Sequence, residues 1–113
     1  EGSIALWDIK EQFLQRTCDA HFHEIVCLQH HKSKPLLLSG SKDCSVKLWS
    51  TPDLNFVNQF GTLKSPVCAL KWSPKNPKKF VSMTQEGAVC FWNTDSDKCE
   101  KRSQIDYGGT LKR

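Results

Sequence analysis

The 113-residue sequence lacks several features that would assign it to a class of function. It has no apolar run of membrane-spanning length, and its first residues lack the pattern of a secretory signal peptide. The net charge of +4 is too mild to indicate an obligate nucleic-acid binder. There is no Gly-rich phosphate loop, and the carboxylates are scattered over expected turns. We therefore expect no membrane span, no catalytic residue and no cofactor.

Six cysteines are present, and their positions favour thiols over disulfides. Cys27, Cys68 and Cys90 fall among apolar residues of predicted strands, where a free cysteine behaves as a small hydrophobic residue. With no signal-peptide pattern, this predicts free thiols in a reducing compartment. We expect the protein in the cytoplasm, the nucleus or both.

The stretch 36–49 reads as a strand, a tight polar turn and a second strand. Val46 and Leu48 alternate with Lys47, which is the period of a half-buried strand. Asp43 supplies the turn with a residue that tolerates tight geometry and can bond its own backbone. The stretch therefore predicts a β-hairpin that ends at Trp49.

The same hairpin pattern occurs three times at a nearly constant period. Segments 1–7, 43–49 and 86–92 each run from an acidic residue to a tryptophan six places later. The three tryptophans, spaced by 42 and 43 residues, are Trp7, Trp49 and Trp92. A second apolar landmark begins 18 residues after each of the first two, at Ile25 and Val67. Landmarks that keep a common register indicate a structural repeat.

The period and the acidic-turn-to-Trp hairpin resemble the WD-repeat family over about residues 1–105. The resemblance implies an all-β fold, namely a partial arc of a propeller built from four-stranded antiparallel blades. It divides the chain into the end of a first blade (1–17), a second blade (18–60), a third blade (61–105) and the start of a following blade or a tail (106–113). Because a propeller closes with about four to eight blades, we expect a segment of a longer chain.

The pattern also predicts the strands. In the first blade it favours strands at 1–7 and 9–17, followed by a corner at 18–24. The strands expected in the second blade are 25–29, 36–40, 45–49 and 56–60. Those expected in the third blade are 67–72, 80–84, 88–92 and 99–105.

The resemblance implies a structural side-chain network in the second blade, formed by His21, Ser39, Asp43 and Trp49. An indole N–H needs an acceptor when it is buried, and a serine hydroxyl can pass the bond on to an imidazole and a carboxylate. The third blade departs from this pattern, since Leu63 stands at the histidine position and Glu86 at the aspartate position, while Ser82 and Trp92 remain.

A cluster of histidines and cysteines raises zinc as an alternative. Its members are Cys18, His21, His23, Cys27, His30 and His31. The Cys-x2-His spacings suit zinc ligands, but the two halves lie at opposite ends of one predicted strand, too far apart for one tetrahedral ion. We therefore predict no metal site.

Two surfaces are candidates for partner binding. Most of the lysines at issue fall in two equivalent loops, and the resemblance implies that these loops emerge on one face of a propeller and form one basic patch. Its members are Lys32, Lys34, Lys75, Lys78 and Lys79, with Lys71 and the two histidines at 30–31 nearby. These lysines are either solvated charges or a site for a polyanion such as nucleic acid, phosphate or an acidic peptide. The opposite face carries the corner and turn residues Phe22, His23, Lys42, Lys64, Ser65 and Gln85. The resemblance implies that such a face takes peptide partners.

The function expected from these features is a non-enzymatic protein–protein interaction scaffold, in a longer chain or a multi-subunit assembly. Polyanion binding through the loop lysines is the alternative, with nucleic acid as a less favoured partner.

Overall fold

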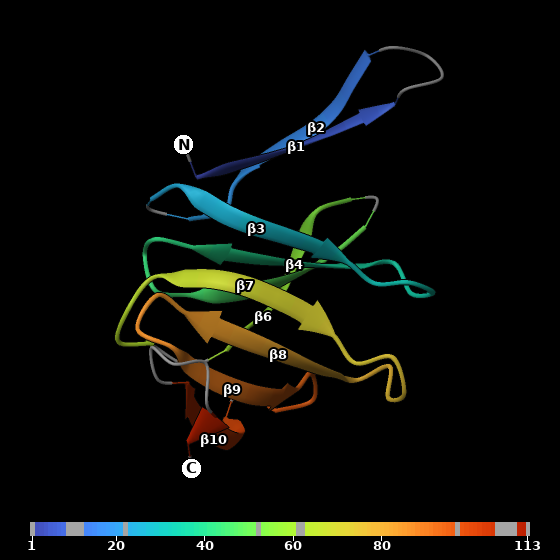
Figure 1. The fold of residues 1–113 in the computed structure, drawn as a ribbon. Helices are drawn as coiled ribbons and strands as arrows, with labels where there is room; N and C mark the ends of the chain where they lie inside the picture. The colour runs from blue at the N-terminus through green and yellow to red at the C-terminus, as the bar shows by residue number, and fades with distance from the viewer. Residues whose placement is uncertain are drawn as a thin grey trace.

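The structure is a computed structural model that describes residues 2–8, 13–21, 23–51, 53–60, 63–96, 98–105 and 111–112. Side chains are described throughout these ranges except at 6–8, 13–18, 104–105 and 111–112. The regular structure in these ranges is all β, arranged as three antiparallel sheets that follow one another along the chain (Figure 1). The all-β fold expected from the sequence is confirmed. In the described part no helix is long and apolar enough to cross a membrane.

Each sheet is built from strands that are consecutive in the sequence. The first sheet pairs β1 (Ser3–Asp8) with β2 (Phe13–Asp19). The second sheet has the order β3 (Ile25–His30), β4 (Leu36–Ser41), β5 (Val46–Ser50) and β6 (Asn55–Gln59). The third sheet repeats this order with β7 (Val67–Trp72), β8 (Lys79–Thr84), β9 (Ala88–Asn93) and β10 (Cys99–Ile105).

A short further strand, β11 (Leu111–Lys112), pairs antiparallel with β10. Residues 111–112 therefore form a fifth strand at the outer edge of the third sheet in this structure.

Strand limits agree with the sequence pattern to within one residue in the second and third sheets. The first sheet differs, because β2 ends at Asp19 where a corner was expected from residue 18. Asp19 stays in the strand since it is paired with Ser3, whose hydroxyl also donates to the Asp19 carboxylate at 2.8 Å. The expected strand start at 9–12 lies outside the described residues.

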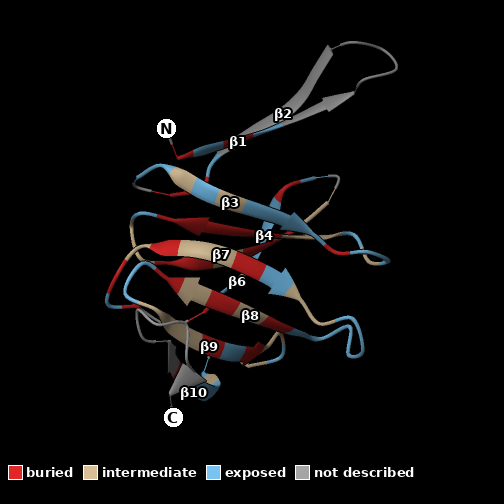
Figure 2. Cartoon of the chain, in the orientation of Figure 1, coloured by how far each residue is buried: buried red, intermediate tan, exposed pale blue. Residues whose placement is uncertain are grey.

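The second and third sheets pack face to face through a continuous apolar core. Alternation along β5 points Val46 and Leu48 into this core, where they are 0% and 2% exposed. Phe60 meets Phe80 and Trp92 edge to face, with ring centroids 4.8 and 5.8 Å apart. Figure 2 shows the resulting burial along β4 and β8, in contrast to the more exposed β3. A smaller cluster that includes Ile4, Ala20, Trp49 and Leu54 joins the first sheet to the second.

Gly40 allows the second and third sheets to approach closely. A Cβ added there would stand 2.7 Å from Val67 Cγ1 and 2.8 Å from Cys27 Sγ. Real Cβ atoms do not come so near to other atoms, so a side chain at this position would push β7 away from β4.

Candidate functional site: a buried polar network and two loop surfaces

The structure brings together the four residues expected to form the network of the second sheet. Trp49 lies on β5, and its indole N–H donates to Ser39 Oγ on β4 at 2.9 Å. Ser39 Oγ lies 2.7 Å from His21 Nε2, and His21 Nδ1 lies 2.9 Å from Asp43 Oδ2. The corner, two strands and the β4–β5 turn are thus connected by one line of hydrogen bonds.

The chemistry of the end groups fixes the direction of these bonds. An indole N–H can only donate and a carboxylate can only accept. The Ser39 hydroxyl therefore donates to His21 Nε2, and the His21 Nδ1–H donates to Asp43. The imidazole in this arrangement is neutral, with its proton on Nδ1.

The surroundings of His21 favour that neutral form. The side chain is buried, and burial lowers the pKa of His21 below its ordinary value of 6.5. The Asp43 carboxylate opposes this shift through its charge and its hydrogen bond, whereas the Lys47 ammonium adds to it. Lys47 is held nearby because its Nζ donates to the Ala20 carbonyl at 2.6 Å.

Two further serines belong to the network and were missed by the sequence reasoning. The Ser45 hydroxyl donates to Asp43 Oδ1, and its oxygen lies 2.9 Å from His21 Nδ1. The Ser41 hydroxyl donates to the Glu24 carbonyl at 2.8 Å and accepts the Asp43 N–H at 3.0 Å. Both serines are buried. Small hydroxyl residues on both sides of a turn aspartate are the signal that could have indicated them.

The third sheet keeps only part of this arrangement. The Trp92 indole N–H donates to Ser82 Oγ at 2.9 Å, as in the second sheet. Leu63, at the histidine position, is 6% exposed and belongs to the core between the sheets. Glu86, at the aspartate position, is exposed. The third repeat tryptophan, Trp7, lies on β1, but its side chain is outside the described part.

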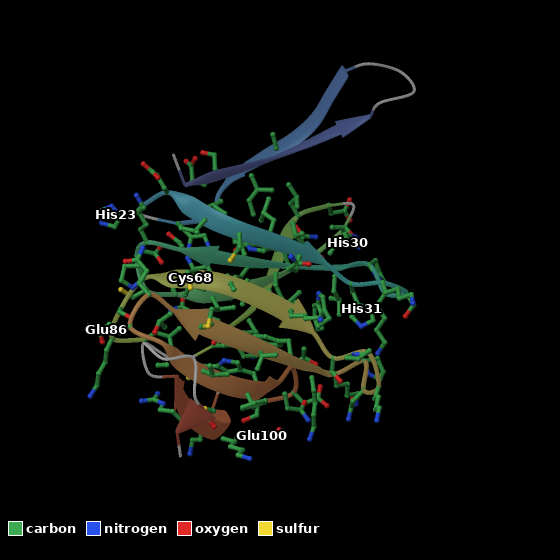
Figure 3. All side chains as sticks on the ribbon, in the orientation of Figure 1. His23, His30, His31, Cys68, Glu86 and Glu100 are labelled. Carbon is green, nitrogen blue, oxygen red and sulfur yellow. The ribbon has the colours of Figure 1, made fainter. Side chains whose placement is uncertain are left out.

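The two lysine-bearing loops lie side by side on one face of the molecule and are linked by His31. The β3–β4 and β7–β8 loops emerge on the same side, where Figure 3 labels His30 and His31. The buried His31 donates from Nε2 to the Pro77 carbonyl at 2.9 Å, while its Nδ1 accepts the N–H groups of Ser33 and Lys34 at 3.0 Å. Its ring also meets Trp72 edge to face, with centroids 4.6 Å apart. The loops of neighbouring sheets are therefore held in a fixed relation.

The loop lysines fall into two groups. Lys78 pairs with Asp95 at 3.0 Å and Lys79 with Glu100 at 3.3 Å, which reduces the positive charge that they present. Within the described ranges, no ion pair involves the remaining three, namely Lys32, Lys34 and Lys75. Lys71 is exposed and lies on β7, one residue before the strand ends at Trp72, so it belongs to the strand and not to the loop. We call the three unpaired lysines the loop surface.

The opposite face carries the corner and turn residues, as the label of His23 in Figure 3 shows. His23, Lys64 and Gln85 are exposed, and Lys42 is exposed while paired with Glu24 at 3.2 Å. We call these four residues the corner surface. Ser65 is buried and is therefore not part of it. Phe22, the aromatic candidate on this face, lies outside the described residues.

The histidines and cysteines do not gather into a metal site in the part that the structure describes. His21 lies in the network at one end of β3, and His30 lies at the other end, where it bonds to Thr51. The five cysteines with described side chains are free thiols. Burial raises the pKa of Cys27 and of Cys90, and the neighbouring Cys68 and Cys99 act in the same direction. Such thiols remain protonated and are poor nucleophiles.

With this geometry in view, comparison with known proteins is informative. A family described as "WD domain, G-beta repeat" matches residues 12–50, which run from the outer strand of the first sheet through the network to the end of β5. Residues 12–50 thus match one WD repeat. The WD-repeat resemblance and the repeat tryptophans therefore agree with the fold.

Three relatives show how the chain relates to longer proteins. It is 28% identical over 100 residues to polyadenylation factor subunit 2 of Candida albicans, covering 88% of this chain and 18% of that protein. It is 26% identical over 110 residues to methylosome protein WDR77 of Xenopus laevis, covering 94% and 32%. It is 32% identical over 62 residues to a cytoplasmic dynein 1 intermediate chain of Drosophila melanogaster, covering 55% and 9%. The chain spans less than a third of the length of each.

Proposed function

We propose that this WD-repeat chain is part of a non-enzymatic scaffold that binds protein partners through its corner surface. WD repeats generally mediate protein–protein interactions in complexes. The observation that carries the proposal is the rigid support under the corner. His21 lies in the corner between the first and second sheets. Its ring nitrogens lie 2.7–2.9 Å from side-chain oxygens of Ser39, Asp43 and Ser45. A surface fixed in this way loses little conformational entropy when a partner binds.

The exposed outer face of the third sheet suits packing against a further blade. Lys71, Val81, Phe91 and Lys101 lie across from one another on β7 to β10, on the face turned away from the second sheet. Phe91 is 36% exposed there, and the Lys101 ammonium lies 5.9 Å from its ring centroid. We infer that another blade covers this face, as the second sheet covers the opposite one. In this reading the three sheets are one incomplete propeller domain with the blade limits given above.

We also propose that the protein is located in the cytoplasm, the nucleus or both.

The experiment compares two surface variants of the full-length protein by affinity purification of its assembly. Alanine at His23, Lys42, Lys64 and Gln85 should remove at least one co-purifying protein while leaving the melting temperature unchanged, because these side chains are exposed. Alanine at the three loop-surface lysines is the matched control and should leave the assembly intact. If the corner variant retains every co-purifying protein, the proposed use of this surface is wrong.

Polyanion binding by the loop surface is the second candidate. The His31–Pro77 bond supports it by holding the two lysine-bearing loops together. Binding of a single-stranded oligonucleotide or of heparin should then weaken steeply as salt rises, and Lys32→Ala, Lys34→Ala and Lys75→Ala together should abolish it. Unchanged affinity in the triple variant would exclude this candidate.

A further inference from the structure

The outer face of the third sheet differs in charge from the equivalent face of the second sheet, which the third sheet covers. In the second sheet a row of paired residues crosses the four strands, and its members are Gln29, Leu38, Leu48 and Asn58. The equivalent row in the third sheet consists of Lys71, Val81, Phe91 and Lys101. The apolar centre of the row is kept, whereas a lysine replaces a neutral residue at each end.

Two further positions change the shape of this face. Gly40, whose lack of a side chain lets β7 approach β4, is replaced by Met83 at the equivalent position of β8. Phe60, which is fully buried between the second and third sheets, is replaced by Ser103 at the equivalent position of β10. A blade that covers the third sheet therefore cannot repeat the contact that the third sheet makes with the second.

A hollow of about 520 Å³ opens at the charged row. Both row lysines line it together with aromatic side chains, namely Lys71, Lys101, Trp72, Phe80, Phe91 and Trp92. Lys79 also lines the hollow, but it is paired with Glu100, which Figure 3 labels, at 3.3 Å. Within the described ranges no ion pair involves the two row lysines. The hollow therefore carries positive charge that these residues leave unbalanced.

The position of Lys101 keeps this charge on the face of the sheet. Its ammonium lies 5.9 Å from the ring centroid of Phe91, and so over the row in place of extending past the sheet edge into water. A contact with an aromatic ring attracts an ammonium but does not replace the hydration that it loses when another element covers it. A hydrogen-bonded carboxylate can offset that loss.

We propose that the further blade which covers the third sheet places the carboxylate of an aspartate or glutamate in this hollow, between Lys71 and Lys101. The inference rests on the further blade proposed above and adds the chemistry of its contact. The two lysines supply the charge complementarity, and Phe91 and Met83 supply apolar surface beside it. The occupant is a blade of the full-length protein, because the face continues the series of packed sheets.

The first test is carbodiimide crosslinking of the full-length protein, which condenses an amine with a contacting carboxylate and releases water. Peptide mass spectrometry should find Lys71 or Lys101 joined to an aspartate or glutamate of the same polypeptide, outside residues 1–113. Lys71→Arg and Lys101→Arg together are the control, since arginine keeps the charge but does not form this link. The link should disappear in that variant, while the melting temperature stays the same.

The second test gives the third sheet the neutral row ends of the second. Lys71→Gln and Lys101→Asn together should lower the melting temperature of the full-length protein by about 2–4 °C, because they leave the carboxylate without a partner. Lys75→Gln and Lys98→Asn form the matched control, since both lysines are exposed and neither lines the hollow. An unchanged melting temperature in the first variant would mean that water hydrates the row lysines, and would overturn the proposal.

Hydroxyl-radical oxidation of Met83 separates failure of this inference from failure of the blade itself. Protection of Met83 without a crosslink from either row lysine would overturn the carboxylate and leave the blade in place. Oxidation of Met83 as fast as in the unfolded protein would exclude the blade, and the inference with it. A crosslink to a different polypeptide would also overturn the proposal, because the occupant of the hollow would then be a partner protein.

Discussion

The second and third sheets solve the same structural problem with different side chains. In both, a tryptophan on the third strand donates its indole N–H to a serine on the second strand, at 2.9 Å in each case. In the second sheet, His21 and Asp43 extend this bond into a line of polar contacts. In the third, Leu63 replaces the histidine and packs into the core. The Trp–Ser bond is thus the shared component, and the His–Asp extension can be exchanged for apolar packing.

The surroundings of the two tryptophans explain why this exchange is tolerated. Trp92 packs against Phe60 and Phe80, which are themselves 0% and 2% exposed. Trp49 meets Phe56, which is 55% exposed. Aromatic packing that is shielded from water contributes more stability than packing at the surface. We infer that the polar network of the second sheet compensates for the smaller stability that aromatic packing contributes there.

The turns that precede the two tryptophans differ as well. Cys44 in the second sheet and Gly87 in the third occupy equivalent positions, with φ of 71° and 85°. Glycine adopts this left-handed conformation without strain, whereas cysteine pays a steric cost. Asp43 accepts the Ser45 N–H at 3.0 Å and so helps to hold the strained turn. The network therefore also stabilises a turn that the third sheet stabilises by residue type.

The largest expected effect comes from removing the shared serine in each sheet. Ser39→Ala should lower the free energy of unfolding by about 2–4 kcal/mol, because it leaves both the Trp49 N–H and His21 Nε2 without their partner. Ser82→Ala should cost about 1–2 kcal/mol, because the Trp92 N–H is the one group bonded to it among the described side chains. Urea-induced unfolding of the full-length protein measures both. Equal losses would show that the bond to His21 contributes nothing to stability.

Smaller losses are expected at the turn. Asp43→Ala should lower the free energy of unfolding by roughly 1–3 kcal/mol, since it removes the acceptor of a buried imidazole and of the Ser45 hydroxyl. Glu86→Ala, the equivalent change in the third sheet, should cost less than about 0.5 kcal/mol because that side chain is exposed. Amide hydrogen exchange should locate the loss from Asp43→Ala in β4 and β5. A loss from Glu86→Ala as large as that from Asp43→Ala would mean that the third sheet has a polar network of its own.

Much of this fold could be predicted because two simple regularities were available. The alternation of apolar residues predicts the limits of β5 and β9 to within one residue. The spacing of the tryptophans indicates that these two strands are equivalent in the repeat. The members of the network could be predicted only by resemblance, since nothing in the spacing of His21 and Asp43 requires them to meet. The structure then supplied the distances and the direction of each bond.

The rest depended on geometry that local sequence does not encode. The bonds of Ser41 and Ser45 follow from the shape of the turn around Asp43. The ion pairs of Lys78 and Lys79 need partners 17 and 21 residues away, whose position is set by the pairing of β8 with β9 and of β9 with β10. A charge count could therefore find the loop lysines, but it could not tell which of them are neutralised.

The smallest expected effect is a pH dependence that belongs to the second sheet, because Leu63 gives the third sheet no imidazole at this position. Burial lowers the pKa of His21, so the unfolded chain binds more protons than the folded chain below pH 6.5. The free energy of unfolding should therefore not be reduced by His21 protonation above pH 6.5. It should fall as the pH decreases from there, by no more than about 1.4 kcal/mol per pH unit for one proton. His21→Gln removes this group, and its unfolding free energy should change less between pH 7.5 and 5.5 than that of the wild type. Because His23, His30 and His31 remain in the variant, the difference between the two pH profiles reports on His21 alone. Parallel profiles would mean that Asp43 balances burial, so that His21 titrates alike in the folded and unfolded chain.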